Sequence, residues 1–308
     1  MNRADVALLF AGQGSQAAGM LDDALCVAPE ARDFLARADD RLDFPLSKMM
    51  RAGEADALFD TTLAQPALLT IGVLHAWHLR QQGVEPCVVI GHSVGQFAAL
   101  VAAGALDFES ALDLVRARAR LMAAAMPPEG GAMAAILSPE RAAVYEACRE
   151  AGSLGVVGVA CHNAPDQTVI SGVRQAVDAV MEALEAQGMR VVPLAVSIAT
   201  HSDLMLPVIE LFAPLVAKCP VADPRTLVID NVTARRLADA AAVRRSMLLQ
   251  LVAPVLFEES VNKVRALGVT SFIQCGPGDV LLRCVRRQFP ESACTEFRDV
   301  FAGAAAVA

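Results

Sequence analysis

Short apolar runs alternate with longer segments of helical periodicity at the start of the chain. The run Val6–Phe10 stops at a Gly-Gln-Gly loop and predicts a buried opening strand. A helical pattern over Thr61–Gln81 is broken at Gly83 and Pro86, directly before a second apolar run at Val88–Ile90. This order of strand, helix and strand is typical of a parallel sheet.

The pattern changes between about residue 131 and residue 194. Its segments follow the order strand, helix, strand, strand, helix, strand, which is the βαββαβ order of ferredoxin-like units. The predicted elements are Ala132–Leu137, Pro139–Glu150, Val156–Cys161, Thr168–Ser171, Val173–Ala186 and Val191–Leu194. Strands near Leu227–Asp230 and Thr270–Cys275 then return to the first unit, so the βαββαβ segment is predicted to be an insert.

Composition predicts a soluble globular protein. The chain has 308 residues, of which 55% are hydrophobic and 19% charged, and it can bury a large core. No run of about 18 uninterrupted apolar residues and no signal-peptide pattern occurs, so no membrane location is expected. The eight cysteines are scattered without a C-x-x-C pair, which favours reduced thiols in the cytoplasm and gives no metal motif. A net charge of −8 argues against nucleic acid as the main partner.

A glycine-flanked serine follows the second apolar run. The segment Gly91-His92-Ser93-Val94-Gly95 precedes an alanine-rich helix expected over about Phe97–Ala103. A serine on such a strand-to-helix turn forms a nucleophile elbow, and the two glycines leave room for the crowded backbone. Ser93 is therefore the candidate nucleophile. The N–H of Val94 and the positive end of the following helix would stabilise an oxyanion beside it.

A serine nucleophile needs a base, and the chain offers five histidines: His75, His78, His92, His162 and His201. His75 and His78 lie in the helical pattern and are interpreted as packing or surface residues. The side chain of His92 is expected to point away from Ser93. Ordinary α/β-hydrolases have their base near the chain end, yet no histidine follows His201 here. His201 is therefore the favoured base, and a loop histidine without catalytic role is the alternative.

Arg118 lies in the middle of an apolar stripe on a helix predicted over about Glu109–Met126. Arg116 and Arg120 are expected on the opposite, solvated face. A guanidinium on an apolar face needs a carboxylate partner. The two interpretations are a structural salt bridge and a bidentate clamp for the carboxylate of a substrate.

Together these residues resemble the malonyl-coenzyme A:acyl carrier protein transacylases and the acyltransferase domains of fatty acid and polyketide synthases. The likeness covers nearly the whole chain. Beyond the elbow, Arg118 and His201-Ser202, it rests on Phe10-Ala11-Gly12-Gln13-Gly14-Ser15-Gln16, Asn163-Ala164-Pro165, Asn231-Val232, Gln250-Leu251, Pro254-Val255 and Gly276-Pro277-Gly278. The implied fold is α/β: an α/β-hydrolase-like large subdomain with a parallel sheet (residues 1–127 and 196–308) and an inserted ferredoxin-like small subdomain (residues 128–195).

The resemblance also implies catalytic roles. Ser93 would attack a malonyl thioester, and His201 would take its proton and later return it to the leaving thiol. The backbone N–H groups of Gln13 and Val94 would hold the oxyanion. A backbone carbonyl near Gln250 would orient His201 in place of an acidic side chain.

The same resemblance implies the ligands. Arg118 would pair with the malonyl carboxylate. The remaining substrate-binding residues would be His92, Asn163 and Thr200. A coenzyme A thioester would be the donor and the phosphopantetheine thiol of an acyl carrier protein the acceptor, without a metal or a permanently bound cofactor. The family suggests a monomer with no nucleic-acid or membrane partner. Because carrier proteins are usually acidic, the candidate docking pairs are Arg235-Arg236, Arg244-Arg245 and Arg286-Arg287.

Three departures from the family pattern leave part of the function open. Gln96 replaces the glutamate of G-H-S-x-G-E, Phe257 replaces a common tryptophan, and Ile198-Ala199-Thr200-His201 matches neither signature that separates malonyl from methylmalonyl users. The leading prediction is an acyltransferase that loads malonyl units onto a carrier protein for fatty acid or polyketide synthesis. The alternatives are the transacylase subunit of a malonate decarboxylase, an editing thioesterase that hydrolyses acyl carrier proteins, and a catalytically idle carrier-protein binder.

Overall fold

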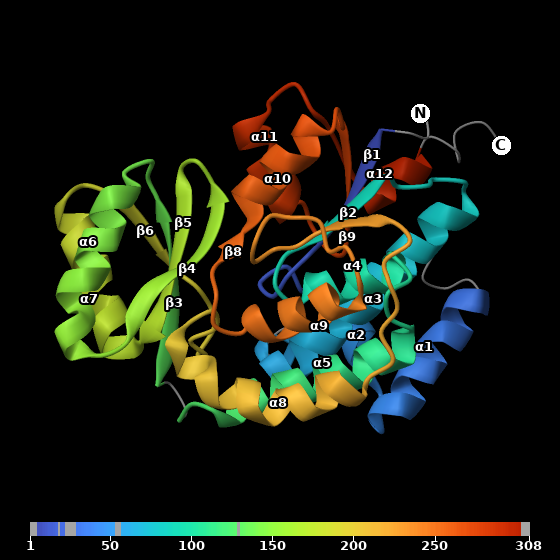
Figure 1. The fold of residues 1–308 in the computed structure, drawn as a ribbon, viewed down its shortest axis with the longest axis horizontal. Helices are drawn as coiled ribbons and strands as arrows, with labels where there is room; N and C mark the ends of the chain where they lie inside the picture. The colour runs from blue at the N-terminus through green and yellow to red at the C-terminus, as the bar shows by residue number, and fades with distance from the viewer. Residues whose placement is uncertain (1–4, 18, 22–28, 53–56, 128–129, 303–308) are drawn as a thin grey trace.

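The chain forms two subdomains, each built around a five-stranded sheet (Figure 1). The computed structural model describes residues 5–17, 19–21, 29–52, 57–127 and 130–302. The small subdomain lies at the left of Figure 1 and the large one at the right. Within the described ranges, no helix combines the length and the apolar character needed to cross a membrane.

The sheet of the large subdomain is parallel throughout. Its strands, in the order β10-β9-β1-β2-β7, are Ala293–Glu296, Ser271–Cys275, Val6–Phe10, Val88–Gly91 and Leu227–Ile229. In the β1–β2 pair, Phe10 lies opposite Gly91, so both strands end at the same edge of the sheet. Both strands are wholly buried. Their uninterrupted apolar runs follow from this, because a central parallel strand is covered on both faces.

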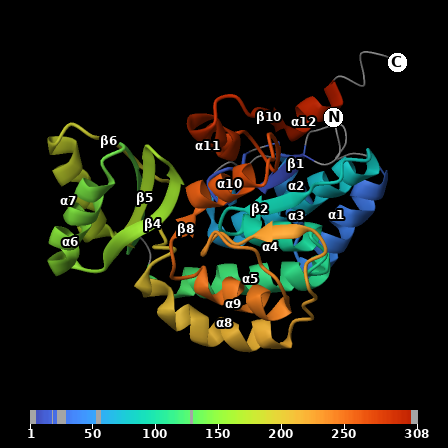
Figure 2. The same ribbon diagram turned by 45° about the horizontal axis from the view of Figure 1, so that its top comes forward.

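Helices cover both faces of this sheet (Figures 1 and 2). Leu8 and Phe10 of β1 pack with α1, α3, α4, α5 and α8, whereas Ala7 and Leu9 pack with α10 and α11. These helices span Pro29–Leu42 (α1), Thr61–Gln81 (α3), Gly95–Ala102 (α4), Phe108–Ala124 (α5), Leu206–Lys218 (α8), Phe257–Ala266 (α10) and Val280–Gln288 (α11). The shorter elements are α2 (Leu46–Ala52), η2 (Ala57–Phe59), η4 (Asp203–Met205), α9 (Ala240–Leu249) and α12 (Phe297–Ala302).

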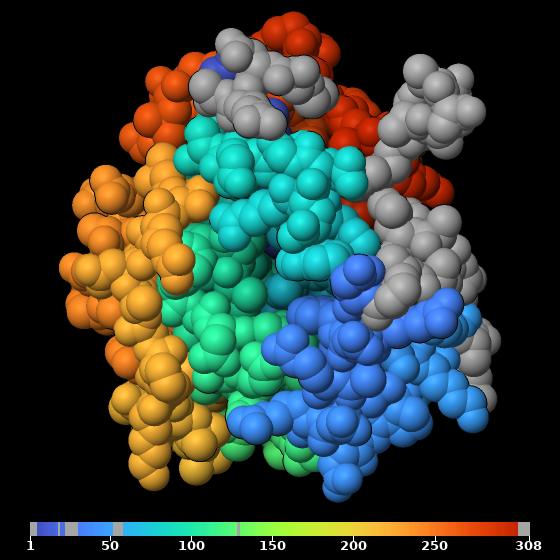
Figure 3. All heavy atoms as spheres, turned by 90° about the vertical axis from the view of Figure 1, so that its right-hand side faces the viewer, coloured from blue at the N-terminus to red at the C-terminus, as the bar shows by residue number. Residues whose placement is uncertain are grey.

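Helix α5 lies between α1 and α8 on the face of the large subdomain turned away from the small one (Figure 3). Ion pairs Arg37–Glu109 and Arg41–Asp113 join α1 to α5. Arg120 is exposed, as predicted. The prediction of a solvated Arg116 is wrong, because α1 covers this part of α5. Arg116 is half-buried and donates a hydrogen bond to the carbonyl of Arg41 at 3.4 Å.

The sheet of the small subdomain has the order β6-β3-β5-β4-β8. Its first four strands pair with one another antiparallel and, with α6 and α7, follow the predicted βαββαβ order. The elements are β3 (Gly131–Leu137), α6 (Arg141–Ala151), η3 (Gly152–Leu154), β4 (Val157–Ala164), β5 (Gln167–Val173), α7 (Arg174–Ala186) and β6 (Arg190–Pro193). Apolar residues of both helices pack on the sheet and form a separate core.

A fifth strand of the small sheet comes from the other end of the chain. β8 (Val255–Leu256) pairs in parallel with β4, with Val255 opposite Cys161. This strand is not predicted from the sequence, since a run of two residues is too short to show any periodicity. Its pairing joins the small sheet to the segment that follows α9, and this junction lies next to the candidate site.

Candidate active site

The edge of the large sheet carries the nucleophile elbow. Ser93 follows β2 with a backbone φ of 51°, the left-handed conformation expected of a nucleophile elbow. A Cβ on Gly91 would lie 2.2 Å from the backbone nitrogen of Gln96, and one on Gly95 would lie 2.1 Å from the carbonyl oxygen of Phe10. Only glycine fits at either position. Helix α4 begins at Gly95, two residues before its predicted start, and its N-terminus lies beside the serine.

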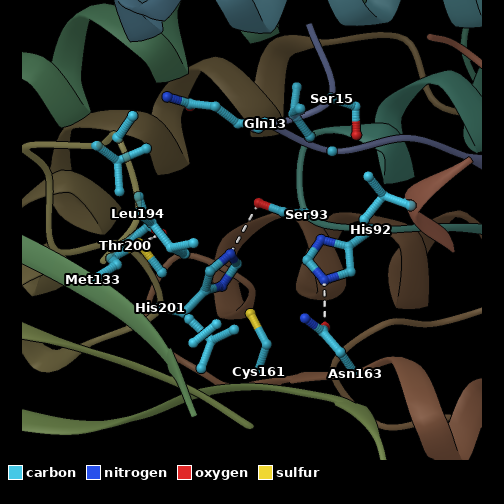
Figure 4. A pocket seen from close by; sticks show the side chains of 18 of the residues that line it. Gln13, Ser15, His92, Ser93, Met133, Cys161, Asn163, Leu194, Thr200 and His201 are labelled. Carbon is cyan, nitrogen blue, oxygen red and sulfur yellow. Dashed lines mark hydrogen bonds between the residues drawn. The ribbon is translucent and has the colours of Figure 1, made fainter. Parts of the chain in front are cut away.

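The side chains of Ser93 and His201 point towards each other in the wall of a cavity (Figure 4). The serine hydroxyl donates to Nε2 of His201 over 2.9 Å. On the other side of the ring, Nδ1 lies 3.2 Å from the carbonyl oxygen of Ala253. A proton on Nδ1 satisfies that carbonyl and leaves Nε2 free to accept, which is the tautomer that a general base requires.

The carbonyl that orients His201 lies three residues after the predicted position. Gln250 is the C-cap of α9 and is fully buried, and its side-chain amide has no hydrogen-bond partner in the described part of the chain. The Nδ1–H of the imidazole donates to the carbonyl of Ala253, while the backbone of Gln250 raises the pKa of the ring. No acidic side chain among the described residues hydrogen-bonds to His201, in line with the expected use of backbone groups.

Burial sets the protonation state of His201. It lowers the pKa of the imidazole from 6.5 to about 3, and the charge of Arg118 and the neighbouring His92 lower it as well. The carbonyls of Ala253 and Gln250 act in the opposite direction. His201 is therefore neutral at pH 7 and can accept a proton.

Arg118 is fully buried beside the nucleophile. Its side chain is 1% exposed and donates from Nη2 to the hydroxyl oxygen of Ser93 at 3.3 Å. Nη1 of the same guanidinium donates a hydrogen bond to the side-chain oxygen of Gln65. Burial lowers the pKa of Arg118 to about 10, so the group stays charged at pH 7. No carboxylate of the described residues pairs with it, which removes the structural salt bridge as an explanation.

Two backbone N–H groups are available near the serine hydroxyl. Gln13 and Val94 both line the cavity, and neither N–H donates to another group in the described ranges. The side chain of Gln13 accepts a hydrogen bond from the Thr61 hydroxyl at 2.9 Å, which fixes this loop. The loop packs closely on the elbow, since a Cβ on Gly12 would lie 2.5 Å from the carbonyl oxygen of His92.

The three remaining predicted residues also line the cavity. His92 points away from Ser93, as predicted, and its Nε2 lies 2.8 Å from the side-chain oxygen of Asn163 (Figure 4). Thr200 directs its hydroxyl to the sulfur of Met133 at 3.3 Å.

The cavity has a volume of about 350 Å³ and lies between the two subdomains. This is within the range of small-molecule sites. Cys161 of β4 and Cys284 of α11 line it, and both are free thiols, as are the other described cysteines. Neither these two cysteines nor Gln65 were predicted from the sequence to belong to the site. Gln65 had a readable signal, because it is a polar residue within the apolar pattern of α3.

The other histidines are packing residues, as predicted for His75 and His78. His75 stacks on Phe297 with ring centroids 3.6 Å apart and accepts from the N–H of Gly276 at 3.1 Å. His162 lies 2.9 Å from the Tyr145 hydroxyl.

Comparison with known proteins identifies the family of this chain. A family model described as acyl transferase domain matches residues 7–301. Over 286 residues the chain is 40% identical to a malonyl CoA-acyl carrier protein transacylase of Bacillus subtilis (strain 168), which covers 92% of this chain and 90% of that protein. The chain belongs to the malonyl CoA-acyl carrier protein transacylase family. The transacylase of Escherichia coli (strain K12) is 37% identical over 284 residues, 91% of this chain and 92% of that protein.

Solved members of the transacylase family share the fold. The transacylase of Coxiella burnetii superposes with a TM-score of 0.94 at 33% identity, covering 98% of this chain and 96% of that one. A malonyl-transacylase in complex with a type II polyketide synthase acyl-carrier protein gives a TM-score of 0.90 at 33% identity, covering 95% and 94%. The predicted α/β fold is thereby confirmed.

The three arginine pairs differ in their relation to the transacylase cavity. Arg286 and Arg287 lie on α11, the helix that also supplies Val280, Leu281 and Cys284 to the cavity wall. They pair with Asp279 at 3.5 Å and Asp166 at 3.0 Å and stay partly exposed. Arg244 instead donates to the carbonyl of Val216 and joins α9 to α8. Arg235 and Arg236 close the turn after β7.

Proposed function

We propose that the protein is a malonyl-CoA:acyl carrier protein S-malonyltransferase that works through a Ser93 acyl-enzyme, in fatty acid or polyketide synthesis. The observation that carries this proposal is the buried, charged Arg118, which has no carboxylate partner in the described chain and lies 3.3 Å from the nucleophile. In a malonyl thioester, one methylene separates the carboxylate from the reacting carbonyl. A carboxylate bound to Arg118 therefore brings that carbonyl to Ser93.

In the first half-reaction, the hydroxyl oxygen of Ser93 attacks the thioester carbonyl while Nε2 of His201 takes the hydroxyl proton. The N–H groups of Gln13 and Val94 donate to the resulting oxyanion, each contributing roughly 3–4 kcal/mol to its stabilisation. The carbon–sulfur bond then breaks, and His201 returns the proton to the coenzyme A thiolate. Malonyl remains on Ser93 as an ester.

The second half-reaction reverses these steps with a different thiol. The phosphopantetheine thiol of an acyl carrier protein loses its proton to His201 and attacks the malonyl ester, and Ser93 leaves with the proton. No bound cofactor takes part. We assign carrier-protein docking to the Arg286-Arg287 pair, because it is partly exposed on the helix that lines the cavity. An acidic partner would be attracted to this pair.

Intact-mass measurement after mixing with malonyl-, methylmalonyl- or acetyl-coenzyme A tests the proposal. A malonyl adduct that is absent from Ser93→Ala, and that moves to a holo carrier protein added afterwards, is the expected result. Loss of every adduct to water without carrier loading would favour a hydrolase. Comparison of the malonyl and methylmalonyl adducts measures the acyl preference, which the segment around Thr200 does not predict.

A further inference from the structure

One short turn holds the catalytic histidine. The turn of residues 250–254 joins α9 to β8, and the N–H of His201 donates to the carbonyl of Leu251 at 3.0 Å. The imidazole bonds the carbonyl of Ala253, and the backbone of Gln250 also favours the charged ring. These carbonyls lie at the C-terminal, negative end of α9. The position of this turn therefore fixes the place of His201, and its carbonyls raise the pKa of the imidazole against the larger, opposite effect of burial.

The buried carboxylate of Asp230 binds α9 at Ser246, one helical turn before Gln250. Asp230 is 2% exposed, and its Oδ1 accepts from the hydroxyl of Ser246 on α9 at 2.5 Å. Its Oδ2 accepts from the backbone N–H and the hydroxyl of Thr233 at 3.1 and 2.8 Å. The carbonyl of Ser246 in turn accepts from the N–H of Gln250 at 3.1 Å. Asp230 is thus linked through Ser246 to the start of the turn that holds the histidine.

The other end of the 250–254 turn is held by Asn231, the residue after Asp230. The N–H of Leu256 donates to the carbonyl of Asn231 at 2.6 Å. Asp230 and Asn231 directly follow β7, whose Ile229 pairs with Ile90 of β2, three residues before Ser93. The nucleophile and the anchor of its base therefore follow two neighbouring strands at one edge of the sheet.

We propose that Asp230 and Ser246 are positioning residues of the transfer reaction. Their hydrogen bond fixes α9 to the edge that carries Ser93, and through the following turn it sets the position of the His201 ring relative to the Ser93 hydroxyl. The hydrogen bonds that the Asp230 carboxylate accepts are charge-assisted, which makes this link stronger than one between neutral groups. The role in transfer rests on the proposed function, whereas the link to the His201 ring does not.

The test compares Ser246→Ala with Ser138→Ala. Ser138 is also a buried serine, and its hydroxyl accepts from the N–H of Glu140 in the small subdomain, so it has no part in the hydrogen bonds that hold α9. Rapid-quench intact-mass measurement gives the rate constant and the KM of acyl-enzyme formation from malonyl-coenzyme A. NMR of isotope-labelled imidazole, assigned with His201→Asn, follows the Nδ1–H that bonds Ala253.

Ser246→Ala is expected to lower the rate constant by about tenfold to a hundredfold, since a misplacement of about 1 Å has an effect of this size, and to leave KM unchanged. Its Nδ1–H signal should move towards that of a weaker hydrogen bond. Ser138→Ala should alter neither readout. If Ser246→Ala fails to fold, Ser246→Cys keeps the volume with a weaker donor and should give a smaller change of the same kind.

Wild-type rates and an unmoved Nδ1–H signal in Ser246→Ala would overturn the inference, and so would equal losses in both serine variants. If the wild-type protein forms no malonyl adduct, the proposed function fails. The NMR comparison then still decides whether Ser246 positions the His201 ring.

Discussion

Removing the guanidinium of Arg118 should impair the binding of a malonyl group without impairing the transfer of an acetyl group. In Arg118→Ala a malonyl carboxylate would enter the buried site without its partner. Leaving one member of a buried ion pair unpaired costs about 3–5 kcal/mol. The expected loss in kcat/KM for malonyl-coenzyme A is therefore between about a hundredfold and several thousandfold.

The kcat/KM for acetyl transfer should not fall in Arg118→Ala. The charge of Arg118 lowers the pKa of His201, and its Nη2 bonds the hydroxyl of Ser93. An acetyl group has no carboxylate to compensate that charge. In Arg118→Ala the pKa of His201 therefore rises, the hydroxyl loses a competing donor, and kcat/KM for acetyl-coenzyme A should be unchanged or higher.

The assay is rapid-quench intact-mass measurement of the acyl-enzyme with both donors. Arg118→Lys keeps the charge without the bidentate fork and should retain part of the malonyl activity. Arg120→Ala, an exposed arginine on the same helix, is the matched control and should behave as wild type. Equal losses for malonyl and acetyl in Arg118→Ala would refute the reasoning, because they would mean that Arg118 only supports the structure.

Three further predictions concern the elbow, acid stability and docking. Gly95→Ala should lower the free energy of unfolding by about 3 kcal/mol or more in urea denaturation, because its Cβ would meet a backbone oxygen. The control is Gly158→Ala, which has nothing within 4 Å of the new Cβ and should unfold as wild type does. Burial lowers the pKa of His75 from 6.5 to about 3, so the unfolded state binds more protons in this window and stability falls as pH drops below 6.5. Wild type should lose about 2 kcal/mol more than His75→Phe between pH 6.5 and about pH 5 in calorimetry. Arg286→Glu with Arg287→Glu should raise the KM for a holo carrier protein at low salt roughly tenfold without changing that for malonyl-coenzyme A, while the same reversals at Arg235 and Arg236 should change neither.

The sequence predicts those parts of the site that depend on side-chain type and regular spacing. The parallel strands are readable because burial on both faces demands continuous apolar runs. The elbow is readable because the glycines at 91 and 95 leave no room for a Cβ. Arg118 is readable because a charge on an apolar stripe is rare without a partner.

Features made by the backbone or by tertiary contact are not readable in this way. Every residue carries a carbonyl, so nothing in the sequence marks Ala253 as the partner of His201. β8 has two residues and forms only because β4 is beside it. Arg116 has the helical position of a solvated residue, and its burial depends on α1, far away in the chain.

The same contrast explains why the nucleophile is easier to find than its base. Ser93 and His201 both have a positive φ, 51° and 57°, which costs a residue with a side chain about 1–2 kcal/mol. At Ser93 the strain is accommodated by flanking glycines, so it leaves a motif. At His201 the neighbours are Thr200 and Ser202, and the conformation is held by a hydrogen bond to Leu251. The strained base therefore depends on a distant turn, and a substitution in α9 that never touches the cavity should impair it before it impairs Ser93.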